Sequence, residues 1–404
     1  MKQKVIIIGG GAAGFFAAIT AAETNPNLEV IILEKGNKVL QKVKVSGGSR
    51  CNVTHACFDP KKLVEFYPRG KKELLGPFHQ FMTGDTMDWF ESRGVKLKIE
   101  TDNRVFPVTN SSQTIIDCLI KSTEKAGVVL KLNQKVEAIS KIKDQFKITS
   151  STETFLADKL VITTGSNPKF WNIIEGLGHT IVTPVPSLFT FKINDQRIKE
   201  IPGISVTNAS ISIAGFPLEV TGPLLVTHWG MSGPAVLKLS AFGAQYLADK
   251  NYQYTVIINW LSKPFSDVLN ELKAQKKEQP KKHVQLKSVL YEIPRRLWEK
   301  LVLAAEIKKD ARWADLSNKQ LEYLANQLTR SVFNAEGKTT FKEEFVTAGG
   351  IDLKEVDFKR FESKKHKNLF FAGEVLNIDA VTGGFNFQNA WTGGYIVGKA
   401  MAAL

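Results

Sequence analysis

A glycine-rich segment near the start of the chain has the residue types and spacing of a phosphate-binding turn. Gly9, Gly11 and Gly14 follow the apolar, β-branched run at residues 4–8, and residues 15–24 continue with helical character. In such a turn the first glycine permits the tight bend, the second lets the backbone approach a pyrophosphate, and the third lets helix and strand pack closely. The helix N-terminus adds free N–H groups and the positive end of its dipole. The segment predicts a dinucleotide site.

A carboxylate completes this pattern. Residues 28–33 form a second apolar run that ends at Glu34, 20 residues after Gly14. At that position a carboxylate accepts hydrogen bonds from the hydroxyl groups of the adenosine ribose. A glycine-rich turn without a ligand is the alternative. The register of strand, turn, helix, second strand and acid favours the bound dinucleotide.

The C-terminal region favours FAD over NAD. Residues 368–372 read as a buried strand that runs into Gly373 and Glu374, as in FAD proteins whose closing strand presents an acid to the ribityl chain. Asp379 and the glycines that follow it lead into a helix predicted to begin near Asn386. The N-terminus of that helix would stabilise negative charge on a reduced flavin.

A second nucleotide domain, for NAD(P)H, is not indicated. The sequence holds one such glycine fingerprint, because Gly394 and Gly398 have the wrong spacing and lie on a predicted helix. Any NAD(P)H must therefore bind transiently in the cleft or not at all. His55, Cys51 and Cys57 lack a recognisable attachment context, so the FAD is expected to be non-covalent.

Composition places the chain among ordinary globular proteins. With 404 residues, 43% hydrophobic and 23% charged, two or three domains are expected. Three irregularly spaced cysteines exclude a disulfide framework or zinc site, no metal is predicted, and a reducing cytoplasm fits. Glycines interrupt the apolar run at residues 5–22, which is therefore assigned to the mature fold and not to a signal peptide. No membrane span is expected elsewhere.

The net charge of +14 raises the question of an anionic partner. Residues 263–312 alone hold 13 Lys or Arg against 7 Asp or Glu. Phosphates, nucleic acid or acidic lipid stay open as partners. No compact RNA- or DNA-binding motif accompanies the charge, and a solvated surface is the simpler explanation. A small-molecule substrate is the partner expected first, and the oligomeric state is left open.

Several longer motifs are more specific than the glycine turn. They are Lys42-x-x-x-Ser-Gly-Gly-Ser-Arg-Cys-Asn52, Thr227-His-Trp-Gly-Met-Ser-Gly-Pro234, Val346-Thr-Ala-Gly-Gly350, Gly373-Glu-Val-Leu376 and Thr382-Gly-Gly-Phe-Asn-Phe-Gln388. Over nearly its whole length the chain resembles the BaiN/YhiN-like flavoproteins, a family of FAD-dependent oxidoreductases that includes aminoacetone oxidase-like members. It departs from the family pattern at Ser49 (Gly), Asn377 (Asp), Ala380 (Gly) and Phe385 (Tyr).

The resemblance implies an α/β fold: a two-dinucleotide-binding, Rossmann-like FAD domain interrupted by an inserted β-rich domain that carries a small helical subdomain. Alternating polar and apolar residues at 189–225 predict antiparallel strands, and Leu, Lys and Glu at helical spacing predict the helices. The expected bounds are 1–188 and 341–404 for the FAD domain, 189–262 and 329–340 for the inserted domain, and 263–328 for the helical subdomain.

The cofactor residues follow from these motifs, and the resemblance adds Val136 at adenine and Thr164 with Gly165 on a strand that returns to the cofactor. The residues expected at FAD are Gly9, Gly11, Ala12, Ala13, Gly14, Glu34, Lys35, Lys42, Ser46, Gly47, Gly48, Arg50, Cys51, Asn52, Val136, Thr164, Gly165, Gly373, Glu374, Asp379, Gly384, Asn386, Phe387 and Gln388. Cys51 is interpreted as a small packed residue and not as a redox thiol, since no resolving cysteine accompanies it.

Three residues are the candidates for catalysis: His228, Arg50 and Asn386. A turn in the inserted domain would bring His228 to the flavin face as a proton donor, and a histidine that only bonds its own loop is the alternative. Asn386 is expected at the isoalloxazine edge, with helix capping as its alternative. The predicted function is an FAD-dependent oxidoreductase acting on an unidentified small molecule, with flavin as the hydride or electron carrier. An RNA-associated flavoprotein and a flavin-bound sensor without turnover are the alternatives.

Overall fold

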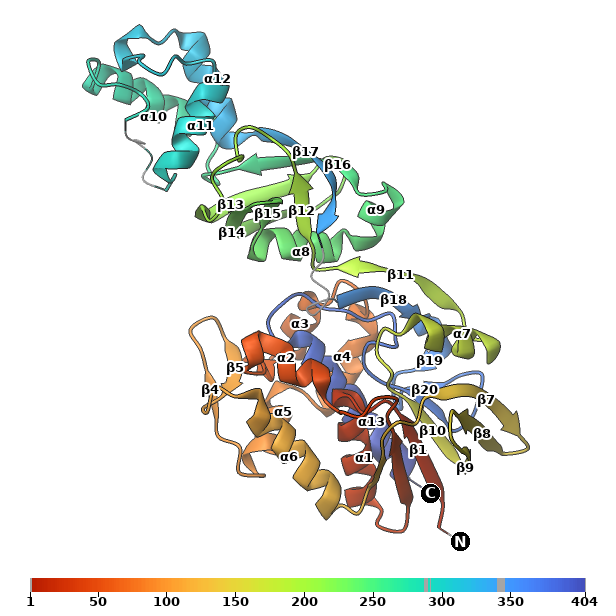
Figure 1. The fold of residues 1–404 in the computed structure, drawn as a ribbon. Coiled ribbons are helices and arrows are strands. Elements are labelled where there is room, and N and C mark those ends of the chain that lie inside the picture. Colours follow the sequence, from red (N-terminus) through yellow and green to blue (C-terminus); the bar gives the residue numbers. More distant parts are fainter. Residues whose placement is uncertain (1, 287–289, 291, 340–345, 404) are drawn as a thin grey trace. The chain divides into compact units, whose positions relative to one another are not determined.

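Two compact units make up the chain in the computed structural model, which describes residues 2–286, 290, 292–339 and 346–403. Unit 1 comprises Met1–Val185 and Val346–Leu404, and unit 2 comprises Pro186–Phe345 (Figure 1). Unit 2 is therefore an insertion in unit 1. The mixed α/β architecture, with a Rossmann-type sheet in unit 1 and a β-rich unit 2, confirms the predicted fold class.

The central sheet of unit 1 has seven strands in the order β19-β20-β21-β10-β1-β2-β6. The five strands from β21 to β6 are parallel, whereas β19 and β20 pair antiparallel at one edge. Their bounds are β1 Lys4–Ile8, β2 Glu29–Leu33, β6 Val129–Lys131, β10 Lys159–Ile162, β19 Val356–Asp357, β20 Glu362–Ser363 and β21 Leu369–Phe371. The central strands β1 and β10 are buried along almost their whole length, as expected for parallel strands covered on both faces.

Helices from opposite ends of the chain lie side by side against this sheet (Figure 1). They are α1, Ala12–Thr24, and α13, Phe385–Ala402. A Cβ added at Gly394 would lie 2.8 Å from Ala13 O, and one at Gly398 would lie 2.5 Å from Thr20 Cβ. The two glycines outside the fingerprint therefore allow two helix backbones to approach closely.

Smaller sheets and helices surround the central sheet of unit 1. One sheet holds β7 Val136–Ile142, β8 Gln145–Ser150 and β9 Thr154–Ala157; another holds β3 Thr54–His55, β5 Arg104–Pro107 and β4 Leu97–Ile99; the third pairs β11 Ile181–Ser187 with β18 Val346–Ile351. The further helices are α2 Gln41–Ser49, α3 Pro60–Leu63, α4 Lys71–Gln80, α5 Thr83–Glu91, α6 Ser112–Lys125 and α7 Pro168–Gly176.

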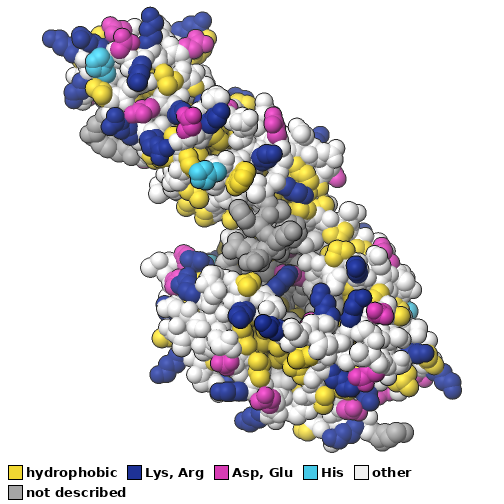
Figure 2. All heavy atoms as spheres, viewed as in Figure 1, with side chains coloured by type: hydrophobic (Ala, Val, Ile, Leu, Met, Phe, Trp, Pro, Cys, Tyr) yellow, Lys and Arg dark blue, Asp and Glu magenta, His cyan; other side chains and the backbone are white. Residues whose placement is uncertain are grey.

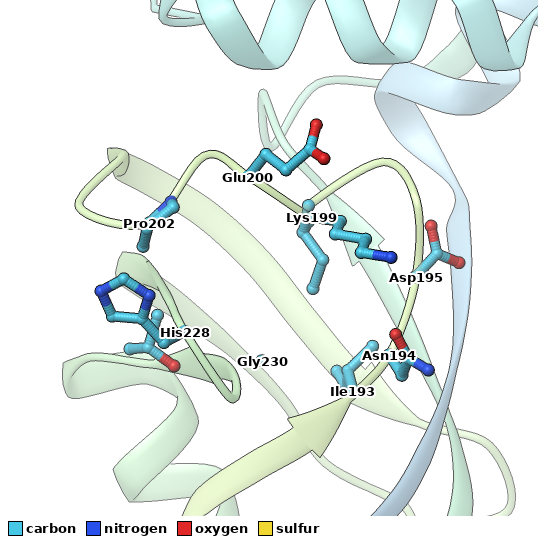
Figure 3. Close-up of a pocket in the computed structure, with 10 residues that line it drawn as sticks. Ile193, Asn194, Asp195, Lys199, Glu200, Pro202, His228 and Gly230 are labelled. Carbon is cyan, nitrogen blue, oxygen red and sulfur yellow. The ribbon is translucent and has the colours of Figure 1, made fainter.

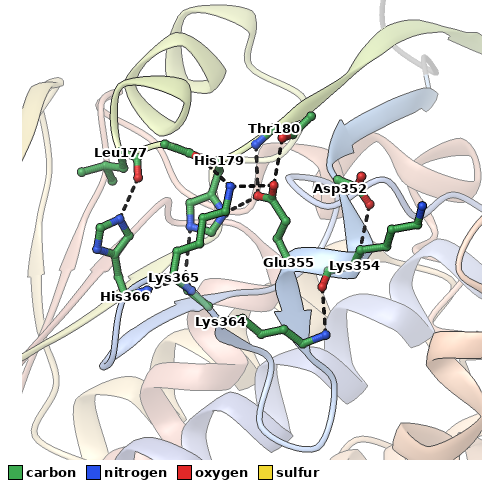
Figure 4. Close-up of polar contacts among 11 residues, drawn as sticks. Leu177, His179, Thr180, Asp352, Lys354, Glu355, Lys364, Lys365 and His366 are labelled. Carbon is green, nitrogen blue, oxygen red and sulfur yellow. Dashed lines mark hydrogen bonds and ion pairs between the residues drawn. The ribbon is translucent and has the colours of Figure 1, made fainter.

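A polar cluster fixes the edge of the central sheet to the loop after α7 (Figure 4). Glu355, at the end of the 3₁₀ turn Leu353–Glu355, accepts hydrogen bonds from His179 Nδ1 at 2.8 Å and from Lys365 Nζ at 2.7 Å. It also accepts from the Thr180 backbone N–H and hydroxyl group. On its other side His179 Nε2 lies 3.0 Å from Ser363 Oγ. Ser363 and His179 are buried and Glu355 is half-buried, and the Ser363 Oγ also accepts from two backbone N–H groups, so the cluster is structural.

Unit 2 is built on a closed barrel with the strand order β12-β15-β14-β13-β16-β17. All its pairings are antiparallel. The bounds are β12 Thr190–Ile193, β13 Ser205–Ile213, β14 Glu219–Thr227, β15 Gly230–Ser232, β16 Gln253–Asn259 and β17 Ser331–Thr339, with α8 Pro234–Phe242 and α9 Ala244–Asp249 beside them. The last strand joins the barrel after an excursion that contains three helices.

These three helices are α10 Phe265–Glu278, α11 Arg295–Ala304 and α12 Asn318–Thr329. Their core includes the fully buried Trp298 and the nearly fully buried Trp313, and it continues into the core of the barrel as one cluster. Across the described residues, no helix is long and apolar enough to cross a membrane.

Candidate functional site

The glycine turn after β1 is shaped by close backbone packing. Gly9 has φ +114°, and a Cβ there would lie 2.5 Å from Thr163 O; a Cβ at Gly14 would lie 2.1 Å from Gly9 O. By contrast, a Cβ at Gly11 would meet nothing within 4 Å. Two of the glycines are thus required by the fold itself, and Gly11 leaves open space at the start of α1. No side chain caps that helix end, so its first N–H groups face this space without a side-chain partner.

Glu34 is held beside the turn by backbone donors. Its Oε2 accepts from the Gly10 N–H at 2.8 Å and its Oε1 accepts from the Gly36 N–H at 2.9 Å. The side chain is only half-buried, and each oxygen keeps a second lone pair for a ribose hydroxyl. The Gln134 N–H donates to Glu34 O, which places the segment leading into Val136 next to the same acid.

The carboxyl ends of three parallel strands meet at this turn. A Cβ at Gly373, after β21, would lie 3.2 Å from Ala13 Cβ, and one at Gly165, after β10, would lie 3.8 Å from Glu374 Oε2. Glu374 in turn forms an ion pair with Lys42 of α2. Residues from positions 9 to 374 are therefore brought together at the edge of the sheet where α/β folds bind ligands.

Two buried polar atoms in this region have no partner in the described structure, Thr164 Oγ1 and Asn377 Oδ1. A buried hydroxyl or amide oxygen without a hydrogen bond costs roughly 1–3 kcal/mol. Together with the open space over Gly11 and the free N–H groups of α1, these atoms are what a dinucleotide with a polar ribityl chain would satisfy. The residues fit FAD.

The loop at residues 46–52 interrupts α2 with an uncommon backbone. Gly47, Gly48, Ser49 and Cys51 all have φ between +56° and +67°, the left-handed region. Glycine adopts this region without strain, whereas Ser49 and Cys51 do not. This explains why glycine is favoured at position 49 in the family pattern. Residues in strained conformations persist where the surrounding structure holds them, as at ligand sites.

Cys51 is enclosed by this loop. Its side chain is fully buried, and burial raises the pKa of the thiol to about 12. The thiol is therefore protonated at neutral pH and is neither nucleophilic nor easily oxidised. Arg50 instead turns outwards, where its guanidinium lies 2.7 Å from Glu100 Oε1 and 3.9 Å from the centre of the Phe106 ring.

The start of α13 is built against β3. With its amide oriented to satisfy its neighbours, Asn52 accepts from the Gly384 N–H and donates to Thr54 O. A Cβ at Gly384 would lie 2.6 Å from Thr54 O, so the contact requires glycine. The Tyr67 hydroxyl donates to Phe385 O at 2.6 Å. The loop 46–52 and the N-terminus of α13 therefore adjoin, and no side chain caps that helix.

Several predicted cofactor residues have side chains that the protein itself engages. Asp379 is fully buried against Arg69, and Gln388 is fully buried among the hydroxyls of Thr54, Thr86 and Thr392. Asp379, Gln388 and Cys51 are each 0% exposed as whole residues. Asn386 accepts from the Ala380 N–H and donates to Ala380 O in the preceding loop, and it does not cap α13. The roles of these residues at FAD stay predictions.

His228 lies in unit 2, in the turn between β14 and β15. It is exposed and lines a cavity of about 430 Å³ formed by residues 193–202 and this turn (Figure 3). Figure 3 shows His228 and Pro202 on one side of the cavity and Asn194 and Asp195 on the other. Arg197 fixes the loop through paired contacts with Asp195 and by stacking 3.9 Å from the Phe333 ring centre. The catalytic role of His228 stays a prediction.

Two side chains at the site were missed by sequence reasoning. Arg69 holds Asp379 across 310 residues of sequence, and His55 Nδ1 lies 3.2 Å from Gly383 O, with its ring 4.5 Å from that of Phe385. Burial lowers the pKa of His55. Neither residue belongs to a recognisable motif, so only the fold reveals them. Within the described residues, no group of three His, Cys, Asp or Glu side chains could hold a metal ion.

Fold and site together define a Rossmann-type dinucleotide-binding protein with an inserted barrel. Residues 3–400 match the family described as HI0933-like protein Rossmann domain. The chain belongs to this family of flavoprotein oxidoreductases, which confirms the predicted family and the predicted enzyme class, an FAD-dependent oxidoreductase.

The relatives extend over the full chain. It is 28% identical over 413 residues to a protein of Escherichia coli (strain K12) named ribosomal RNA dihydrouridine synthase, covering 100% of this chain and 98% of that protein. It is 26% identical over 412 residues to the 3-dehydro-bile acid delta(4,6)-reductase of Clostridium scindens, covering 99% of each. The solved 3-ketosteroid-delta4-(5alpha)-dehydrogenase from Rhodococcus jostii RHA1 aligns with a TM-score of 0.52 and 13% identity, covering 100% of this chain and 97% of that one, a likeness of fold alone.

Proposed function

We propose that the chain binds FAD non-covalently in unit 1 and reduces a carbon–carbon double bond conjugated to a carbonyl group. What carries the proposal is the chemistry that the two full-length relatives share by name. Dihydrouridine is uridine in which the ring double bond next to a carbonyl group has been reduced. A delta(4,6)-reductase of a 3-dehydro bile acid acts on double bonds that are conjugated with a ketone. A bond of this kind accepts hydride because the carbonyl stabilises the negative charge that results.

Unit 1 supplies the cofactor contacts. The open space over Gly11 and the N-terminus of α1 receive the pyrophosphate, and Glu34 accepts from the adenosine ribose. Glu374, Thr164 and Asn377 supply polar atoms for the ribityl chain. The N-terminus of α13 directs its positive dipole end at the flavin edge that becomes negative on reduction.

When bound, FAD supplies the hydride to one carbon of the double bond. The chain must supply a proton to the neighbouring carbon, and the exposed imidazole of His228 is the donor that we propose. Arg50 belongs to the loop 46–52, and to act at the substrate its guanidinium would have to leave Glu100. NADH or NADPH would supply the electrons, and because the sequence holds one glycine fingerprint it would bind only transiently.

Anaerobic reoxidation of the flavin tests this function. The yellow protein, expected to release FAD and not FMN on acid denaturation, is photoreduced and mixed with a panel of cyclic enones, uridine and their saturated counterparts. Conjugated substrates should restore the oxidised flavin spectrum and their saturated products should not. Reoxidation by no conjugated compound, with FAD present, would refute the reductase assignment.

The proton donor is tested in the same assay. His228→Ala should keep the FAD and slow reoxidation by an active enone at least about ten-fold, because positioned acids contribute roughly 10²–10⁴-fold. His79→Ala, which removes another exposed histidine at the end of α4, is the control and should be silent. Equal reoxidation rates for the two variants would refute the proton-donor role. The alternative, that His228 only bonds its own loop, would then stand.

A second substrate candidate is the uracil ring within RNA. Two observations favour it: the net charge of +14 and the name shared by the relatives from Escherichia coli and Haemophilus influenzae, the latter 28% identical over 405 residues. Mass spectrometry of RNA incubated with the photoreduced protein tests it. A gain of two mass units on uridine is expected, and its absence would leave the small-molecule substrate.

A further inference from the structure

We propose that the helical part of unit 2 docks RNA by its phosphates, on a basic surface formed by Lys281, Lys282, Lys308, Lys309 and Arg312. This inference extends the second substrate candidate, the uracil ring within RNA. It rests on the proposed function in one respect, that the bound RNA contains a base that the protein can reduce. The surface itself is defined by backbone pairing, exposure and charge within unit 2.

Backbone hydrogen bonds bring two basic segments together. The Trp313 N–H donates to Lys282 O at 3.0 Å, the Val284 N–H donates to Ala311 O at 3.0 Å, and His283 and Arg312 form a β-bridge. His283 Nδ1 also donates to Asp310 O at 2.8 Å. Residues 282–284 and 311–313 therefore pair as a short antiparallel ribbon, and Lys308 and Lys309 lie in the turn that leads into it.

Two buried tryptophans support this ribbon from inside. Trp313 is buried next to Trp298, and the Trp298 indole N–H donates to Val284 O at 2.8 Å. The basic side chains lie on the outside and all five are exposed. A surface whose backbone is already fixed loses little further conformational freedom when it binds a partner.

These five Lys and Arg side chains differ in their ion pairing from other basic residues of the helical part. Other Lys and Arg side chains of the helical part form ion pairs. These are Lys263 with Glu271 and Glu292, Arg295 with Glu299, and Lys300 with Glu200. Among the described residues, none of the five forms an ion pair. The acids nearest in sequence are Glu278, Glu306, Asp310 and Asp315, and Asp315 accepts from the Arg312 backbone N–H. Figure 2 shows Lys and Arg side chains spread over this part of unit 2.

RNA phosphates match this surface better than a small anion does. Five exposed cations on adjoining segments can each contact a separate phosphate, and a polyanion gains because each contact releases condensed counterions to the solvent. The set contains no aromatic side chain for base stacking, so it would position RNA without reading its sequence. Recognition of the RNA sequence and reduction of the base would then take place at other surfaces of the protein.

The test is salt-dependent binding of a labelled 20-nucleotide oligouridine to the full-length FAD-loaded protein. In the patch variant, Lys281, Lys282, Lys308 and Lys309 are all replaced by Gln. The control variant replaces Lys125, Lys141, Lys143 and Lys147 of unit 1, which are also exposed, so both variants lose the same charge. At about 0.7 counterions per single-strand contact, the patch variant should lose about 3 units of the slope of log K against log salt and about a hundred-fold in affinity at low salt.

The control variant should bind within about three-fold of wild type. Equal weakening of both variants would show that only total charge matters and would overturn the surface, as would unchanged binding by the patch variant. Patch-dependent binding to phosphatidylserine vesicles without binding to oligouridine would overturn RNA as the occupant. Flavin content and enone-dependent reoxidation should be unchanged in the patch variant, so a failure of the reductase assignment is visible separately.

Discussion

The two units differ in how strictly their structure dictates the identity of individual residues. In unit 1, Gly9, Gly14 and Gly384 each occupy a place where a Cβ would lie within 2.6 Å of backbone atoms, so residue identity is fixed by local geometry. Unit 2 has one comparably tight place, Gly230 in the Thr227–Pro234 motif, where a Cβ would lie 2.2 Å from Phe191 O. Elsewhere its barrel is held by a large apolar core in which strands alternate inward and outward. Close backbone contacts leave a motif in the sequence, whereas apolar packing tolerates many sequences of similar volume.

The same contrast applies to the two candidate sites. The cofactor site gathers residues at the carboxyl ends of β1, β10 and β21, which parallel pairing must bring to one edge. The cavity beside His228 is formed by a loop that Arg197 fixes through side-chain contacts. One site follows from topology and the other from particular side chains.

The largest effect is expected from Gly14→Ala. Its Cβ would lie 2.1 Å from Gly9 O, and neither the helix nor the turn can move without breaking the packing. The FAD-free protein should lose more than about 3 kcal/mol of unfolding free energy, measured by urea denaturation, and should retain no FAD.

Gly11→Ala is the matched control. Gly11 has φ −95° and ψ −171°, an ordinary extended conformation, and its added Cβ meets no protein atom. Stability of the FAD-free protein should therefore change by less than about 0.5 kcal/mol, whereas the Kd for FAD should rise at least about ten-fold because the methyl occupies the phosphate space. Unchanged FAD affinity would place the pyrophosphate elsewhere.

A smaller effect is expected from Glu34→Ala. Losing a charge-assisted hydrogen bond costs about 1.5–3 kcal/mol, which is roughly ten- to a hundred-fold in FAD affinity. Part of the loss also reflects the Gly10 and Gly36 N–H groups that Glu34 now satisfies. Equilibrium dialysis against FAD measures the change, and Glu34→Gln should restore part of it because an amide oxygen still accepts.

The sequence predicts unit 1 better than unit 2 for physical reasons. The turn, Glu34 and the C-terminal helix are short-range patterns, and α13 begins at Phe385, one residue before the predicted start. The enclosure of Asp379 by Arg69 and of Gln388 by three hydroxyls could not be predicted, because the partners lie far apart in the sequence and follow no spacing rule. Alternation predicted antiparallel strands but not their closure into a barrel, which depends on β17 pairing with β12 across about 140 residues.

Acid should weaken unit 1 through the Glu355 cluster. Burial alone would raise the pKa of Glu355, but hydrogen bonds from Lys365, Thr180 and His179 outweigh it and lower the pKa from 4.5 to about 2. The ionised form is therefore favoured by folding, and its contribution is complete above pH 4.5 and is lost as the pH falls towards 2. Burial lowers the pKa of His179 despite Glu355, so its protonation opposes folding as the pH falls below 6.5.

Glu355→Gln tests this dependence. The variant should be less stable at pH 7 by up to about 3 kcal/mol and should lose less stability than wild type between pH 4.5 and 2.5, measured by urea unfolding. The pH dependence between 6.5 and 5, to which His179 contributes, should persist in part. Parallel curves for wild type and variant would show that Glu355 does not carry the acid sensitivity of unit 1.

The smallest effect, and the only stabilising one, is expected from Ser49→Gly. Ser49 has φ +64° between Gly48 and Arg50, and a non-glycine residue in this region costs on the order of 1 kcal/mol. Glycine should raise the unfolding free energy of the FAD-free protein by about 1 kcal/mol, less the entropy that glycine gains in the unfolded chain. Arg50→Gly is the matched comparison, since Arg50 has φ −94° and holds Glu100, and this change should destabilise. If Ser49→Gly is neutral or destabilising, backbone strain does not govern the loop, and the contrast drawn between a backbone-determined unit 1 and a packing-determined unit 2 fails at the cofactor site itself.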